Sequence, residues 1–114
     1  MSESLGKVTI APGVLVSIAR LTTLAMPGVA GFCPTGVRSL LGNKEGGGVQ
    51  LVVEDDQVTV DVRIAVEHGT NILQLSQELQ TKIARAIQNM VGMNVATVNV
   101  YIADVEFPPS KAQS

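Results

Sequence analysis

Residues 58–66 read Val-Thr-Val-Asp-Val-Arg-Ile-Ala-Val, and this stretch decides the fold of the chain. Apolar side chains occupy every second position, and the residues between them are Thr59, Asp61, Arg63 and Ala65. A period of two over nine residues is typical of a β-strand with one buried face and one exposed face. The stretch therefore predicts the central strand of the fold.

The segments on either side of this strand predict a hairpin and a helix. Upstream, Val49, Leu51 and Val53 alternate in the same way, and Asp55-Asp56 suits a turn between the two runs. Downstream of Gly69 the apolar residues recur at three- and four-residue steps: Ile72, Leu75, Leu79, Ile83, Ala86, Ile87 and Met90. That spacing is the apolar stripe of an amphipathic helix, which Asn71 can cap and Gly92 can end.

The first third of the chain predicts a strand, a helix and a second, short strand. Residues 7–11 alternate, and Pro12 suits the first position of a helix. The apolar face of that helix is predicted to comprise Val14, Leu15, Ile18, Leu21, Thr22 and Ala25. Met26-Pro27-Gly28 ends the helix, because proline cannot continue its backbone hydrogen bonds, and residues 29–32 follow as a short strand.

The remaining segments are an irregular stretch and a final strand. Residues 33–48 include three adjacent glycines and read as a loop, in which Val37–Leu41 suit one or two helical turns. Residues 97–103 alternate again and predict the last strand. The phase of this alternation slips near Asp104, which indicates a bulge or a strand end there.

Together these elements predict an α+β fold: a two-layer sandwich in which a mixed β-sheet carries two helices on one face, in the order β-α-β-β-β-α-β. Fully buried parallel strands would read as continuous apolar runs, whereas these strands alternate, so one sheet face should stay open. We expect a flexible lead-in over 1–6, a single domain over 7–107 and a flexible tail over 108–114. The open face is predicted to present Lys7, Thr9, Gln50, Thr59, Asp61, Arg63, Thr97, Asn99 and Tyr101.

Composition and charge narrow the kinds of function open to the chain. Its 114 residues suit one domain, and 46% hydrophobic with 3% aromatic residues predicts an aliphatic core. A net charge of −2 gives no general attraction to nucleic acid or to anionic lipid. The single cysteine, Cys33, fits a reducing cytoplasm. We expect neither a secretory signal in residues 1–20 nor direct membrane insertion, which needs ~18 consecutive apolar residues.

No catalytic, cofactor-binding or metal-binding residue is predicted, so we expect a protein that is not an enzyme. Cys33 lacks a recognisable base and oxyanion donors, and an inert thiol is the better interpretation. His68 beside Glu67 offers too few ligands for a zinc site, which needs three or four. The glycines at 46–48 lack the spacing of a phosphate loop, and the acidic cluster at 54–56 lacks the alternation of a calcium loop.

Four residues of the predicted open face form the candidate partner-binding site: Asp61, Arg63, Asn99 and Tyr101. They lie together if the strands at 57–67 and 96–103 are neighbours. Tyrosine and arginine are enriched at binding hot spots, but both are also common on solvated sheet faces. The sequence leaves both interpretations open.

Several pieces of the chain, taken in order, resemble the bacterial alkaline-shock-protein family, also described as a cell-envelope-stress family of small cytosolic proteins. They are GKVTIAP at 6–12, PGVAG at 27–31, GVQL at 48–51, VDVRIAVEHG at 60–69, LQxKIxxAI at 79–87 and MVGMNVATVNV at 90–100. The resemblance covers nearly the whole chain, from about residue 6 to residue 107. The chain departs from the family pattern at Ala11, where serine or threonine is common, and at His68, where an aromatic residue is frequent.

The resemblance implies a non-enzymatic protein-interaction module, a scaffold or adaptor linked to bacterial cell-envelope homeostasis or stress response. Members have no established catalytic residues, and some are held near the membrane by a separate anchored partner. The implied partner is therefore a protein, and the implied location is the cytoplasm, with membrane association through that partner. The sequence leaves a homo-oligomer open, together with two alternative functions: a small-ligand-binding regulatory domain and an accessory subunit of a metabolic enzyme.

Overall fold

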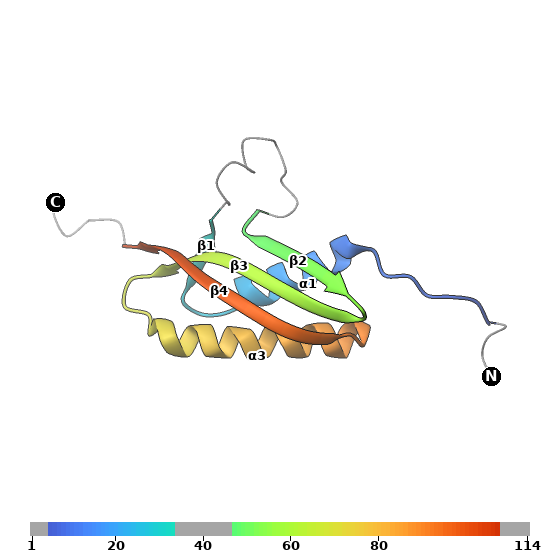
Figure 1. Cartoon of the computed structure of the whole chain (residues 1–114). Coiled ribbons are helices and arrows are strands. Elements are labelled where there is room, and N and C mark those ends of the chain that lie inside the picture. Colours follow the sequence, from blue (N-terminus) through green and yellow to red (C-terminus); the bar gives the residue numbers. More distant parts are fainter. Residues whose placement is uncertain (1–4, 34–46, 108–114) are drawn as a thin grey trace.

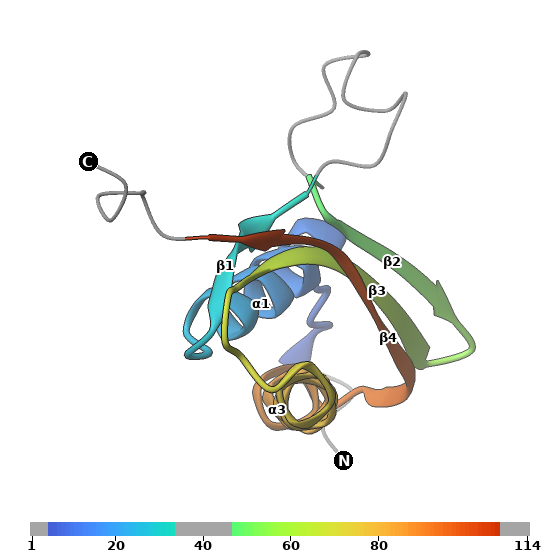
Figure 2. The same ribbon diagram turned by 90° about the vertical axis from the view of Figure 1, so that its left-hand side faces the viewer.

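The computed structural model describes residues 5–33 and 47–107 as a four-stranded sheet with two helices packed on one face (Figure 1). The elements are α1 (Pro12–Leu24), β1 (Val29–Phe32), β2 (Val49–Glu54), β3 (Gln57–Glu67), α3 (Ile72–Val91) and β4 (Asn94–Glu106). Viewed along α3, the sheet curves over both helices and its other face stays open (Figure 2). The predicted α+β class and the placement of both helices on one face are confirmed.

β3 is the centre of the sheet and pairs with every other strand. β2 runs antiparallel along its first half, and β1 runs antiparallel along its last residues. β4 lies on the opposite side of β3 and runs parallel to it, so α3 is the crossover that returns the chain to the same end of the sheet. The sheet is therefore mixed, and the strands at 57–67 and 96–103 are neighbours.

The β2–β3 hairpin turns at Asp55 and Asp56, as predicted. Both residues have positive φ, 50° and 67°, which is the conformation that the two central residues of a type I′ turn require. Aspartate tolerates this region better than most residues because its short polar side chain bonds locally. The turn sets a register that puts Val49, Leu51 and Val53 on the same face as the apolar residues of β3.

The core lies between that face and the two helices. β3 contributes five residues that are almost completely buried: Val58, Val60, Val62, Ile64 and Val66. α3 contributes four more at four-residue steps: Leu75, Leu79, Ile83 and Ile87. These two rows, at periods of two and of about four, are the direct outcome of the two sequence patterns.

α3 begins and ends where the sequence predicts, but its buried stripe is shorter. Asn71 Oδ1 accepts a hydrogen bond from Gln74 N at 3.0 Å, and Gly92 ends the helix in the left-handed conformation with φ 77°. Ile72 and Met90, predicted as part of the stripe, are exposed. Both stand in terminal turns of the helix, outside the four buried positions.

α1 buries only part of the predicted stripe: Leu15 and Ile18 are buried as expected, and the rest of the buried face differs. Val14 and Leu21 are exposed, Leu21 to 69%, and the buried residues are Leu15, Ile18, Ala19 and Thr23. The Thr23 hydroxyl donates to Ala19 O at 2.8 Å, so its burial leaves no unpaired donor. α1 packs on α3, and the face that a helix buries is set by such packing, which hydrophobicity alone does not predict.

The structure differs from the prediction at residues 7–11, which form no strand. Val8 is 87% exposed, and the segment before α1 runs away from the sheet (Figure 1). Two inward apolar residues bury too little area on a single chain to offset the ordering of the segment. From α1 onward the order of elements matches the prediction.

β4 is longer than predicted, and its bulge is confirmed. The strand starts at Asn94, and its register shifts where Ile64 faces Ile102 and Ala65 faces Asp104, so Ala103 has no partner on β3. The predicted helical turns at Val37–Leu41 lie outside the described residues. Neither helix in the described ranges is long and apolar enough to cross a membrane.

Candidate functional site

The open face of the sheet brings the four predicted partner-binding residues together. Because β3 and β4 are parallel neighbours, Asp61 pairs in register with Asn99, and Arg63 pairs with Tyr101. Neighbouring strands lie about 5 Å apart and alternate residues about 7 Å apart, so these side chains form one compact patch. Asp61, Arg63, Asn99 and Tyr101 are called the sheet-face patch below.

Within the described residues, Asp61 and Asn99 of the sheet-face patch are hydrogen-bonded to each other, whereas Arg63 has an unpaired nitrogen. Asn99 Nδ2 donates to Asp61 Oδ1 at 2.7 Å across the two strands. Arg63 Nε is buried, yet it has no hydrogen-bond partner within the described part of the chain. Arg63 as a whole is half-buried and Tyr101 beside it is 49% exposed, so both side chains present surface to a partner.

β2 extends the open face beyond the sheet-face patch. In register, Gln50 faces Asp61, and Val52 faces Thr59. Val52 is exposed, so the face carries apolar as well as polar surface. The predicted members Lys7 and Thr9 do not belong to this face, because residues 7–11 pair with no strand.

A cluster at the ends of segment 34–46 was not predicted. Arg20 Nη1 on α1 donates to Gly47 O at 2.9 Å, and the guanidinium carbon of Arg20 lies 4.6 Å from the ring centroid of Phe32. Gly48 has φ 81°, and a Cβ there would lie 2.7 Å from Phe32 Cβ. These four residues, Arg20, Phe32, Gly47 and Gly48, are called the loop base below. The sequence showed only a run of glycines, which indicates mobility and not a close contact.

The loop base meets the sheet-face patch at Arg63. Cys33 N donates to Arg63 O at 2.9 Å, and Arg63 N donates to Gly48 O at 2.8 Å. The ends of β1 and β2 therefore reach β3 at the same residue. Cys33 and Gly48 therefore flank the backbone of Arg63.

Cys33 and His68 lie in separate surroundings. Cys33 is a half-buried free thiol at the end of β1. His68 is exposed, its backbone N donates to Glu106 O at 2.8 Å, and its ring lies 4.7 Å from the ring of Phe107. No group of three or more His, Cys, Asp or Glu side chains placed to hold a metal occurs among residues 5–33 and 47–107.

The double variant Cys33→Ser with His68→Ala is expected to fold and to capture the same partner as the parent chain. The contact of Cys33 with the sheet-face patch is a backbone hydrogen bond to Arg63 O, which serine keeps. An aromatic pair such as His68 with Phe107 contributes at most about 1.5 kcal/mol beyond burial. Circular dichroism and affinity capture check the two parts. A variant that folds and no longer captures a partner would contradict this expectation.

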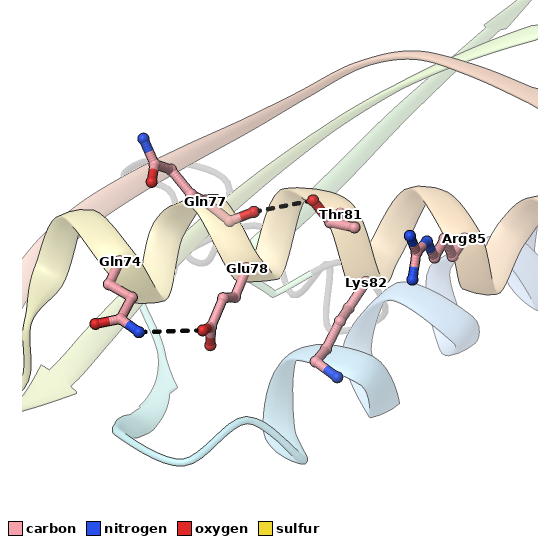
Figure 3. Close-up of a pocket in the computed structure, with 6 residues that line it drawn as sticks. All are labelled: Gln74, Gln77, Glu78, Thr81, Lys82 and Arg85. Atoms are coloured by element: carbon pink, nitrogen blue, oxygen red, sulfur yellow. Dashed lines mark hydrogen bonds between the residues drawn. The ribbon is translucent and has the colours of Figure 1, made fainter.

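The exposed side of α3 carries a hollow lined by one helix alone (Figure 3). Its lining residues are Gln74, Gln77, Glu78, Thr81, Lys82 and Arg85. Gln74 Nε2 donates to Glu78 Oε2 at 3.3 Å, and Thr81 Oγ1 donates to Gln77 O at 3.3 Å, each across one helical turn. Acidic and basic groups stand side by side in it, as expected of a solvated helix face. The hollow therefore gives no support to a ligand site.

Comparison with known proteins places the chain among bacterial relatives. A family model, the alkaline shock protein 23 family with a cell envelope-related function, matches residues 1–107. The chain is 34% identical to the protein YqhY of Bacillus subtilis over 113 residues, which covers 96% of this chain and 83% of YqhY. It is also 34% identical to YloU of Bacillus subtilis over 58 residues, covering 51% of this chain and 48% of YloU.

Solved structures of MamM CTD have a similar fold. A zinc form of a MamM CTD variant matches with a TM-score of 0.52 and 11% identity, covering 86% of this chain and 90% of that chain. A second MamM CTD variant matches with a TM-score of 0.51 and 14% identity, covering 82% of this chain and 94% of that chain. At such low identity the likeness concerns the fold alone.

Proposed function

The chain belongs to the alkaline shock protein 23 family, whose described function is cell envelope-related, and from this premise we propose that it is a non-enzymatic protein-interaction module. In this proposal it acts as a scaffold or adaptor in bacterial cell-envelope homeostasis or stress response, and the sheet-face patch is its working surface. The observation that carries the proposal is the pairing in register of the half-buried Arg63 with Tyr101, which is 49% exposed, on the open face of the sheet.

The chemistry of the sheet-face patch favours a protein partner that presents a hydrogen-bond acceptor. A carboxylate or a backbone carbonyl would satisfy Arg63, and a charge-assisted bond of this kind is stronger than a neutral one. Tyr101 supplies a rigid ring with a polar end, which binding hot spots favour. The hydrogen bond between Asn99 and Asp61 holds the neighbouring side chains in place, so little ordering is needed on binding.

A membrane-anchored protein is the partner class that the family resemblance implies. Such a partner would bring this chain to the cytoplasmic side of the membrane without insertion of the chain itself. The net charge of −2 is consistent with this route, because it gives no general attraction to anionic lipid.

Arg63→Ala and Tyr101→Ala are each expected to weaken partner binding at least ~30-fold, because truncating a hot-spot residue costs about 2 kcal/mol or more. Their melting temperatures should barely move, since neither side chain belongs to the hydrophobic core. Affinity capture from the source bacterium followed by mass spectrometry identifies the partner, and titration calorimetry with that partner measures the change.

Matched controls come from exposed residues away from the sheet-face patch. Arg85→Ala on α3 removes a guanidinium, and Phe107→Ala removes an exposed ring, and both should leave binding unchanged. Unchanged binding in both Arg63→Ala and Tyr101→Ala would contradict the proposal and direct the search to residues 33–48.

A further inference from the structure

We propose that the N-terminal segment of one copy of this chain adds as a strand to the free edge of β2 in a second copy. Residues 5–11 are called the N-terminal arm, and the side of β2 away from β3 is called the β2 edge. The inference is independent of the sheet-face patch, because it concerns the edge of the sheet and not its open face.

The N-terminal arm has the pattern of a strand but pairs with no strand in the part of the chain that the structure describes. Val8 and Ile10 alternate with Lys7 and Thr9, which is the period of a strand with one apolar side. In the structure the arm pairs with nothing within the described residues, and Leu5, Val8 and Ile10 are all exposed. Apolar side chains that alternate along an extended, unpaired segment are the means by which a strand attaches to another sheet.

Among residues 5–33 and 47–107 nothing pairs with the β2 edge, and β2 carries exposed apolar side chains on both faces. Within the described residues β2 pairs with β3 only. Val52 on the open face and Val53 on the helix face are both exposed. An edge of this kind offers unpaired N–H and C=O groups for backbone hydrogen bonds, and it offers apolar contacts beside them.

Two observations favour the β2 edge over the edge of β4: the charge of the residues next to β2, and a hydrogen bond that α3 already makes to β4. β2 runs into the exposed acidic residues Glu54, Asp55 and Asp56, and the arm carries Lys7, so the two segments have opposite charges. On β4, Gln80 Nε2 from α3 donates to Val98 O at 3.1 Å and already occupies one of the acceptors at that strand. The β2 edge is therefore the better match for the arm.

The geometry at the start of α1 favours a second copy over the same chain. Ala11 immediately precedes Pro12 and has φ −67° and ψ 142°, the extended conformation to which a residue before proline is restricted. The arm consequently continues away from its own sheet (Figure 1). Two copies can exchange their arms reciprocally, which gives a closed two-fold dimer.

Val8→Asp tests the arm. Because Val8 is 87% exposed in the single chain, the change should not affect the fold, but it places a charge where the arm would pack on β2. We expect a dimer for the parent chain by analytical ultracentrifugation and a dissociation constant at least ~10-fold higher for Val8→Asp. Leu73→Asp, at an exposed apolar residue on α3, is the matched control and should dimerise like the parent.

A charge exchange tests the edge. Lys7→Glu should weaken the dimer, and adding Glu54→Lys to the same chain should restore it, because each arm would again meet an opposite charge. In a Cys33→Ser background, Val8→Cys with Val53→Cys should form a covalent dimer on oxidation, whereas Val8→Cys with Val95→Cys on β4 should not.

Three results would overturn the proposal. The first is a parent chain that stays monomeric at all concentrations. The second is a dimer that Val8→Asp leaves unchanged. The third is a failure of Glu54→Lys to restore the Lys7→Glu dimer, which would remove the assignment to the β2 edge. Loss of partner binding in Arg63→Ala has no bearing on any of these results, so this proposal and the proposed function can fail separately.

Discussion

Replacing Ile83 by alanine is expected to lower the free energy of unfolding by about 2–5 kcal/mol. Ile83 is 0% exposed and lies in the middle of the buried row of α3, against the apolar face of the sheet. Removing three carbon atoms there loses their transfer free energy and leaves a cavity that the close-packed surroundings fill only in part. Equilibrium unfolding in urea, followed by circular dichroism, measures the change at constant m-value.

The neighbouring exposed residue provides the control for Ile83. Lys82 lies on the solvated side of α3, so Lys82→Ala should change the free energy of unfolding by no more than about 0.5 kcal/mol. If Ile83→Ala costs less than about 1 kcal/mol, the side of α3 that faces the sheet has been misassigned.

Gly48→Ala is expected to lower the free energy of unfolding by more than ~2 kcal/mol, from two separate causes. The backbone at Gly48 has φ 81°, and a residue with a Cβ in the left-handed region costs roughly 1–2 kcal/mol. The new Cβ would also lie 2.7 Å from Phe32 Cβ, so β1 or the loop base must shift. Thermal unfolding by calorimetry measures the combined effect.

Gly13→Ala serves as the matched control for Gly48. No neighbouring atom lies within 4 Å of a Cβ at Gly13, and the residue lies in the first turn of α1. Alanine has the higher helix propensity, so this variant should be as stable as the parent or up to about 1 kcal/mol more stable. Equal stability of Gly48→Ala and Gly13→Ala would show that the loop base is not a close contact.

The periodic parts of the chain could be predicted from the sequence because they reflect local backbone geometry. The alternation of residues 58–66 gave the buried face of β3, and the spacing from Leu75 to Ile87 gave the buried row of α3. Asp55-Asp56, Asn71 and Gly92 marked ends of elements, since turns and caps depend on a few adjacent residues. The membership of the sheet-face patch followed from the same alternation, on the condition that two strands were neighbours.

The tertiary structure alone decided which surfaces meet. The hydrophobic pattern of α1 does not rank Ala19 and Thr23 above Val14 and Leu21, because the choice depends on how the helix packs against its neighbours in the fold. The alternation at residues 7–11 is equally local, but a strand exists only where an edge of a sheet is within reach.

The same limit applies to the candidate site. The sequence placed Arg63 on the open face, whereas its unpaired Nε and its position between the ends of β1 and β2 depend on residues far apart in the chain. In the sequence, Gly48 is one of three adjacent glycines that indicate a flexible loop. In the structure, Phe32 occupies the space that a Cβ at Gly48 would need. The periodicity of a segment predicts which of its side chains face the core and which face solvent. Packing between distant segments determines which polar atoms lack a hydrogen-bond partner.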